Sequence, residues 1–152
     1  MKSNSFSFKN ICAMTLIPTA LGVSLPTYAD TFVGNLGAPA SSTDVYAVTC
    51  PLGTVTMRAN VDDNGGIDNV RLTVQVINPQ GDATTAFTAV DNGLSATATL
   101  AGGGPGNYLV TISKSQPAGT VLLVENYLAN MDCFNAAGTP FAGNQALLVQ
   151  NQ

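Results

Sequence analysis

The side chains best suited to chemistry lie in the short acidic segment 62–68, Asp-Asp-Asn-Gly-Gly-Ile-Asp. Asp62, Asn64 and Asp68 fall at positions 1, 3 and 7 of a calcium loop, a class that supplies six to eight oxygen ligands. Thr73 occupies position 12, where an EF-hand needs an acid, so the segment is not an EF-hand. The spacing predicts a calcium site of another kind. A plain acidic hairpin turn would have the same composition and is the alternative.

Several chemistries are excluded by residue types that the chain lacks. It contains no His, no Trp and a single Glu, Glu125. Without histidine, neither a Ser-His-Asp triad nor a Cys-His site can form, and a histidine-ligated zinc, copper or iron site is equally impossible. The glycine-rich run 102–106 lacks the Gly-Lys-Ser/Thr ending of a phosphate-binding loop. We therefore expect a protein without enzymatic activity.

The cysteines predict one disulfide bond. Cys12 lies in an N-terminal segment that we expect to be removed, which leaves Cys50 and Cys133. An even number of cysteines in an exported chain indicates a disulfide. A Cys50–Cys133 bond would close a loop of about 83 residues, worth about 4 kcal/mol in the chain-entropy model. Two free buried thiols or an intermolecular bridge are the alternatives.

Residues 1–29 have the pattern of a secretory signal peptide. Lys2 and Lys9 lie before an apolar stretch that begins at Ile11. Thr27-Tyr28-Ala29 then places small residues where a signal peptidase cleaves. The apolar stretch is about 15 residues, shorter than the roughly 20 that a membrane-spanning helix needs. We expect cleavage near Ala29, no membrane insertion, and secretion to the periplasm or the extracellular space.

The chain that follows, 30–152, is acidic and sparsely charged. Its basic residues are Arg58, Arg71 and Lys114, against nine acidic residues. Three scattered cations cannot neutralise a phosphate backbone, and anionic membrane surfaces are unsuitable for the same reason. We therefore expect no nucleic-acid partner.

The sequence pattern predicts that short β-strands position these residues. Apolar residues alternate with polar ones, which is typical of antiparallel strands with one buried face. Asn92-Gly93 predicts a hairpin between two of these strands. The predicted strands are 44–50, 54–61, 69–77, 83–90, 94–100, 108–115, 120–127 and 146–150. About eight short strands at regular spacing indicate an all-β protein, an antiparallel β-sandwich or jelly roll.

The predicted sandwich occupies residues 44–152. The preceding segment, 30–43, is rich in Gly, Ala, Pro and Ser and is either a linker or a loosely attached first strand. Tyr46 and Tyr108 are in phase with apolar neighbours, so we expect buried rings. The outward threonine rows, Thr54/Thr56 and Thr97/Thr99, suit a flat, weakly charged surface, which is either simply solvated or packs against a partner.

Three stretches of the chain share one pattern: an Asp-x-Tyr strand, a strand that ends in Pro-x-Gly, and a Gly-x-Tyr-x-Val-x-Ile strand. They are Asp44-Val45-Tyr46-Ala47-Val48, Asn78-Pro79-Gln80-Gly81 and Gly106-Asn107-Tyr108-Leu109-Val110-Thr111-Ile112. In this pattern the chain resembles the bacterial pre-peptidase C-terminal domain (PPC-like). The resemblance covers roughly residues 44–115, and the tail after Glu125 departs from it. It implies a non-catalytic β-sandwich that accompanies secreted hydrolases, in some cases binding calcium or a matrix polymer.

These features predict a secreted, non-enzymatic binding or accessory protein of the bacterial cell envelope or extracellular matrix. Its partner would be a surface or matrix polymer, and calcium is the candidate cofactor. The alternative is a self-assembling subunit of an extracellular fibre or coat, which binds copies of itself. An open sheet edge accepts a strand from another chain, and segment 31–42 or 145–152 would supply it.

Overall fold

The computed structural model describes residues 30–64, 70–88, 96–117, 121, 123–142 and 144–151. Within these residues the chain forms β-strands and no helix. The strands are β1 (Asp30–Leu36), β2 (Thr43–Cys50), β3 (Thr56–Asp63), β4 (Arg71–Ile77), β5 (Ala83–Phe87), β6 (Ala96–Ala101), β7 (Gly106–Ser115), β8 (Glu125–Phe134) and β9 (Gln145–Gln150). The predicted signal peptide, 1–29, lies outside the described residues.

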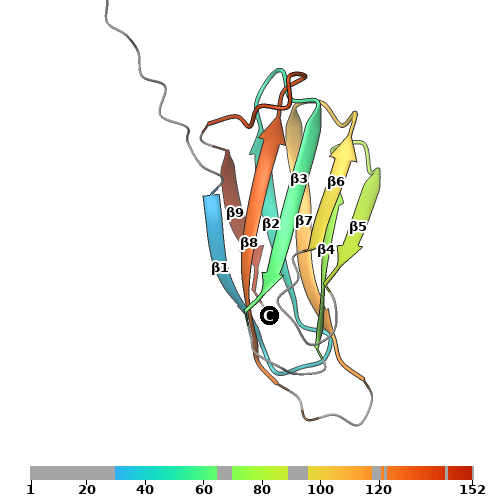
Figure 1. Ribbon diagram of the computed structural model, residues 1–152, viewed down its shortest axis with the longest axis vertical. Coiled ribbons are helices and arrows are strands. Elements are labelled where there is room, and N and C mark those ends of the chain that lie inside the picture. The colour runs from blue at the N-terminus through green and yellow to red at the C-terminus, as the bar shows by residue number, and fades with distance from the viewer. Residues whose placement is uncertain are drawn as a thin grey trace, which may run out of the picture.

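The strands form two antiparallel sheets that pack face to face (Figure 1). Sheet A has the order β1-β8-β3-β6, and sheet B has the order β5-β4-β7-β2-β9. Consecutive strands lie in different sheets, except for the β4–β5 pair. This confirms the predicted antiparallel β-sandwich, with nine strands where about eight were expected.

Alternation along the strands places the apolar core between the sheets. Leu72, Val74 and Val76 of β4 are fully buried, as the sequence pattern predicts. The rings of Tyr46 and Tyr108 are also buried, at 3% and 0% exposure, which confirms their predicted position. Every second residue of these strands therefore faces outward, and these residues make up the surfaces described below.

The predicted hairpin between segments 83–90 and 94–100 is wrong. β5 pairs with β4 in sheet B, whereas β6 pairs with β3 in sheet A. Asn92-Gly93 itself lies outside the described residues. The turn residues indicate where the chain reverses, but they do not determine whether the next strand joins the same sheet or the facing one.

Two predicted boundaries also need correction. Thr54 was expected to face outward, but it is buried, and its neighbour Val55 is 39% exposed. The reason is a turn: the Thr54 hydroxyl donates to the Pro51 carbonyl at 2.8 Å, and β3 begins only at Thr56. The strand predicted at 120–127 is β8, which begins at Glu125 and runs to Phe134.

Segment 30–43 contains an edge strand. β1 pairs with β8 over its whole length, from Asp30↔Met131 to Leu36↔Glu125, and Leu36 is fully buried. Gly34 is required in β1 because the Tyr127 ring lies against it, and a Cβ at this position would overlap the ring. The strand is therefore fitted to the core by a close backbone approach.

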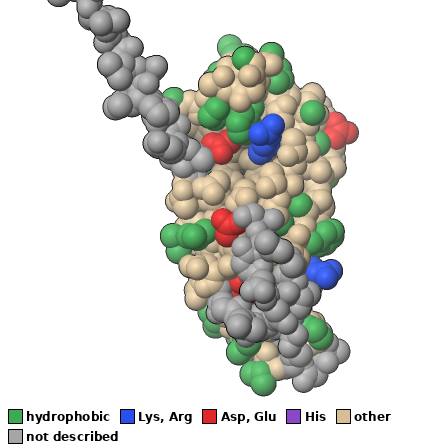
Figure 2. Space-filling view, viewed as in Figure 1, with side chains coloured by type: hydrophobic (Ala, Val, Ile, Leu, Met, Phe, Trp, Pro, Cys, Tyr) green, Lys and Arg blue, Asp and Glu red, His purple; other side chains and the backbone are tan. Residues whose placement is uncertain are grey.

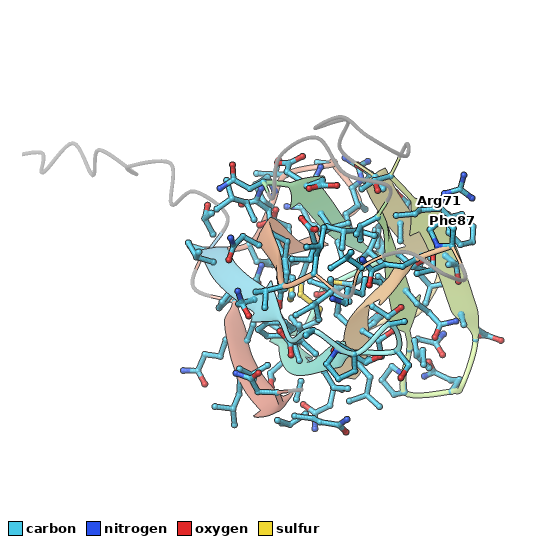
Figure 3. The ribbon with its side chains drawn as sticks, turned by 90° about the horizontal axis from the view of Figure 1, so that it is seen from below. Arg71 and Phe87 are labelled. Carbon is cyan, nitrogen blue, oxygen red and sulfur yellow. A yellow bond between two sulfur atoms is a disulfide. The ribbon has the colours of Figure 1, made fainter. Side chains whose placement is uncertain are left out.

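The predicted disulfide is present. Cys50 ends β2 in sheet B and Cys133 lies in β8 in sheet A, with their Cα atoms 5.6 Å apart. The bond crosses the inside of the sandwich (yellow in Figure 3) and joins residues 83 positions apart. It therefore connects the two sheets covalently at one end of the core.

Candidate functional site

The outer face of sheet B carries a continuous apolar stripe. Leu109 of β7 pairs with Ile77 of β4 on one side and with Ala47 of β2 on the other, and Ala47 pairs with Leu147 of β9. Leu109 is 44% exposed and Leu147 is 67% exposed. These four residues, the apolar stripe, cross four adjacent strands. Single exposed apolar residues are ordinary on protein surfaces, but contiguous ones mark contact surfaces.

The stripe ends at an open sheet edge. β9 pairs with β2, and Leu147, Leu148 and Val149 are exposed on it. A register shift between Val45 and Tyr46 marks an irregularity in this pairing. The four edge strands β1, β5, β6 and β9 contain no Lys, Arg or Pro, the residues that usually protect an edge against pairing with another chain.

The outer face of sheet A has the opposite character. A row of hydroxyl and amide side chains, Thr31, Asn130, Asn60 and Thr97, crosses its four strands. The Thr31 hydroxyl donates to Asn130 Oδ1 at 2.8 Å, and Asn60 Nδ2 donates to the Thr97 hydroxyl at 3.4 Å. Figure 2, viewed from this side, shows few charged side chains here. The predicted outward position of Thr97 and Thr99 is confirmed, since both are exposed.

The two arginines lie on opposite outer faces, each beside an aromatic ring. The Arg58 guanidinium lies 4.4 Å from the centroid of the Phe134 ring on sheet A, in cation–π geometry. Arg71 and Phe87 lie side by side at a corner of sheet B (Figure 3), where Phe87 is 60% exposed. Neither arginine forms part of a basic patch with the other, which is unfavourable for binding a polyanion.

The predicted calcium residues are only partly placed by the structure. Asp62 lies in β3 and Asn64 directly after it, where the Asn64 backbone N–H donates to the Asn126 carbonyl at 3.0 Å. Asp63, between them, faces the core and is 8% exposed. Asp68 lies outside the described residues. Among the described residues no group of three or more His, Cys, Asp or Glu side chains could hold a metal ion, so calcium binding stays a prediction.

A hydrogen-bonded polar group lies inside the sandwich at the end opposite the disulfide. The Tyr127 hydroxyl donates to Asp44 Oδ2 at 2.6 Å and lies 2.8 Å from the Tyr46 hydroxyl. It thereby links β8 of sheet A with β2 of sheet B. Burial, and then the hydrogen bond to Asp44, raises the pKa of Tyr127 well above its ordinary value of 10.0. Burial also raises the pKa of Tyr46, so both hydroxyls resist ionisation at alkaline pH.

Two further charged side chains are buried at this end. Lys114 of β7 is 4% exposed, and its Nζ donates to the backbone carbonyls of Leu123 and Ala38, the latter at 3.4 Å. Glu125, at the start of β8, is fully buried. Lysine and glutamate are almost never fully buried unless they are paired, so their place in a core is a candidate functional feature.

Sequence reasoning missed this buried group because it treated charged residues as outward-facing. Asp44, Lys114 and Glu125 each lie in phase with apolar core residues of their own strands, such as Tyr46, Ile112 and Tyr127. Their position in the alternation, on the same side of the strand as buried apolar residues, was the pattern that could have predicted their burial. Lys114 lies on β7, which is an interior strand between β4 and β2, so it cannot protect a sheet edge.

No protein-family model matches the chain, and no curated protein matches it in sequence. In the part of the chain that the structure describes, no helix has the length and hydrophobicity to cross a membrane. A functional proposal therefore has to come from the surfaces and buried groups of the fold.

Proposed function

We propose that this chain is a secreted, non-enzymatic binding or accessory protein of the bacterial cell envelope or extracellular matrix, and that it acts through the outer face of sheet B. The observation that carries the proposal is the apolar stripe Ile77–Leu109–Ala47–Leu147. Removing exposed apolar area from water contributes roughly 25 cal/mol per Å². A contiguous row of such side chains therefore favours contact with a partner.

Export is supported by the disulfide, because such bonds persist in oxidising compartments outside the cytoplasm. The signal-peptide pattern of residues 1–29 points the same way. The absence of histidine from the sequence argues against most hydrolytic sites. The resemblance to the PPC-like domain, which spans β2 to β7, also favours an accessory role with calcium as a candidate ligand.

The surroundings of the stripe indicate the chemistry of the partner. Two rows further along the same face, the register places the uncharged polar residues Thr43, Ser113 and Thr73 side by side. Such a face suits a flat surface that offers apolar patches and hydroxyl groups, as a matrix polymer or another protein does. A highly charged polymer would gain little from it.

A second candidate function, a self-assembling subunit of a fibre or coat, is favoured by the β9 edge. Its backbone groups on the side away from β2 are not paired within the described sheet, and Leu147, Leu148 and Val149 are exposed there. A strand from a second copy added at this edge would extend sheet B and cover these side chains. Of the two donor segments proposed from the sequence, 31–42 contains most of β1, which is already paired with β8, and 145–152 contains β9, which is already paired with β2.

The two functions are separated by one pair of variants and one control. Leu109→Asp places a charge at the centre of the stripe, and Leu147→Asp places it at the edge. Val33→Asp is the matched control, because Val33 is also exposed, at 77%, but lies on β1 of sheet A.

Binding is measured by co-sedimentation with purified peptidoglycan and with cellulose, and assembly by light scattering and electron microscopy. A binding protein loses co-sedimentation with Leu109→Asp and stays monomeric. An assembling subunit forms particles or filaments that Leu147→Asp abolishes. If the wild-type protein neither co-sediments nor assembles, or if Val33→Asp has the same effect as the other two, the proposed surface is wrong.

A further inference from the structure

Three charged side chains from three strands are buried inside the sandwich, toward the end opposite the disulfide. They are Asp44 on β2, Lys114 on β7 and Glu125 on β8, with exposures of 1%, 4% and 0%. The apolar stripe and the β9 edge do not involve them. Because burial of charge is expensive, a buried lysine flanked by two buried acids needs a physical explanation.

Asp44 and Lys114 are close neighbours on the inner face of sheet B. β2 and β7 are antiparallel, and Asp44 pairs with Ile112, so Lys114 is its diagonal neighbour two residues further along. Diagonal neighbours on one face lie about 7–8 Å apart between backbones, which a long side chain can span. The Lys114 amine can therefore reach the Asp44 carboxyl without a change in the strands.

On the facing sheet, Glu125 lies in the sequence between a residue that contacts Lys114 and a residue that contacts Asp44. The Lys114 amine contacts the carbonyl of Leu123, two residues before Glu125. The Tyr127 hydroxyl, two residues after Glu125, donates to Asp44 Oδ2. Glu125 faces the same interior as Tyr127, since both are fully buried on β8. Its carboxylate is thus placed to carry protons from the amine to the Asp44 carboxyl.

We propose that Lys114 and Asp44 condense to form an intramolecular isopeptide bond, with Glu125 as the proton carrier. The Nζ lone pair attacks Asp44 Cγ, a C–N bond forms, and a C–O bond breaks. Two of the three protons of the ammonium leave Nζ and depart with the Asp44 oxygen as one water molecule. The reaction is a condensation, so it needs no oxidant, reductant or further reactant.

The surroundings favour this step. The Tyr127 hydroxyl donates to Oδ2, so it stabilises the negative charge that develops on that oxygen in the tetrahedral intermediate, and the other oxygen leaves. Burial excludes water, which would otherwise favour hydrolysis of the amide. The product replaces two buried charges with one neutral amide, and this removes the cost of burying them.

The bond would join β2 to β7 across the loop from residue 44 to residue 114. The disulfide already joins β2 to β8 at the other end of the core. β2 would then be held covalently at both ends, by a bond that reducing agents break and by one that they do not. This cross-link affects stability alone, so its test is independent of the test of the proposed contact surface.

The test is the intact mass of the secreted protein after full reduction and denaturation. The cross-linked chain is lighter than its sequence mass by one water molecule. Trypsin does not cleave at an acylated lysine, so the fragment that ends at Arg58 stays joined to the fragment that begins at Leu72. A wild-type protein at its full sequence mass, with these fragments separate, overturns the proposal.

Three variants identify the participants. Lys114→Arg keeps the charge but cannot form the amide, so it shows the full sequence mass. Glu125→Gln keeps the shape but cannot carry the proton, so most of it stays at full mass. Asp44→Asn reaches the same mass as the cross-linked wild type, because ammonia leaves instead of water. A loss of water that persists in Lys114→Arg arises elsewhere in the chain and refutes the assignment.

Discussion

The two ends of the sandwich core contain side chains of opposite polarity. At one end the Cys50–Cys133 disulfide lies beside Met57, whose sulfur is 4.0 Å from Cys50 Sγ, and all three residues are buried. At the other end Asp44 and Lys114 occupy the corresponding inward positions near the start of β2 and the end of β7. The same two sheets therefore close over an apolar, covalently linked end and over a polar, charged end.

The difference shows which kind of interaction determines each end. Apolar packing is non-directional, and it tolerates exchanges of similar volume. Buried charges require particular partners, and a missing partner costs the full penalty of desolvation. The polar end is therefore the more sensitive to substitution.

The largest expected effect comes from removing Lys114. Lys114→Met leaves Asp44, Glu125 and Asp63 as buried acids at one end of the core and also removes the nitrogen of the proposed amide, and the loss of a partner for buried charge costs about 3–5 kcal/mol. Urea denaturation measures the loss of unfolding free energy. Arg71→Met is the matched control, because Arg71 is exposed on the neighbouring strand β4, and its effect stays within about 0.5 kcal/mol.

If Lys114→Met loses no more unfolding free energy than Arg71→Met, the buried charges do not determine the stability of the polar end. The proposed difference between the two ends is then wrong. If Lys114→Met loses more, Lys114→Arg separates charge from shape. Retention of most of the stability in Lys114→Arg identifies the positive charge, rather than the proposed amide, as the stabilising feature, whereas a loss as large as that of Lys114→Met is the result expected if the amide forms.

Opening the disulfide gives the next largest effect. Cys50→Ser, paired with Cys133→Ser to avoid a free thiol, lowers the free energy of unfolding by about 2–5 kcal/mol, because the unfolded chain regains the freedom of the closed loop. The wild-type protein contains no free thiol once the predicted signal peptide with Cys12 is removed. Thiol titration under denaturing, non-reducing conditions checks this, and about two thiols per chain would contradict the bond.

The sequence predicts the disulfide end of the core better than the polar end, because the two ends leave different patterns in the sequence. Cys50 and Cys133 are the two cysteines of the expected mature chain, so their bond follows from counting. The apolar strand faces follow from alternation. Glu125 and Lys114 escaped prediction because a charged residue in a strand is normally assigned to the solvent side, and only its phase with core residues argues otherwise.

The apolar stripe escaped prediction for a different reason. Leu109, Ala47 and Leu147 are far apart in the sequence, and their adjacency depends on the register of β7, β2 and β9. Short-range patterns fix which face of a strand is buried, but they do not fix which strands are neighbours. The wrong hairpin between β5 and β6 has the same origin, since pairing partners are a property of the whole fold.

A smaller loss is expected from removing one hydroxyl. Tyr127→Phe keeps the ring that packs against Gly34 but leaves Asp44 Oδ2 and the Tyr46 hydroxyl without this partner. The cost of unsatisfied buried polar groups is about 1–3 kcal/mol. Tyr108→Phe is the control at the disulfide end, where the hydroxyl donates to the Gly104 carbonyl at 2.6 Å. The melting temperature of Tyr127→Phe should be lower than that of Tyr108→Phe. The reverse order would contradict the view that the polar end is more sensitive to substitution than the disulfide end.

The smallest effect is a pH dependence of stability at the alkaline side. Burial raises the pKa values of Tyr127 and Tyr46 above 10.0, so the unfolded chain loses their protons before the folded chain does. Their contribution is complete below about pH 10 and is lost as the pH rises further, by at most about 1.4 kcal/mol per pH unit for each tyrosine. Urea midpoints of the wild type should be level from pH 8 to pH 10 and fall toward pH 11. Tyr127→Phe should reduce this slope, because phenylalanine has no proton to lose. An unchanged slope in Tyr127→Phe would show that the buried hydroxyl does not resist ionisation, and the polar end would then be no more sensitive to pH than the disulfide end.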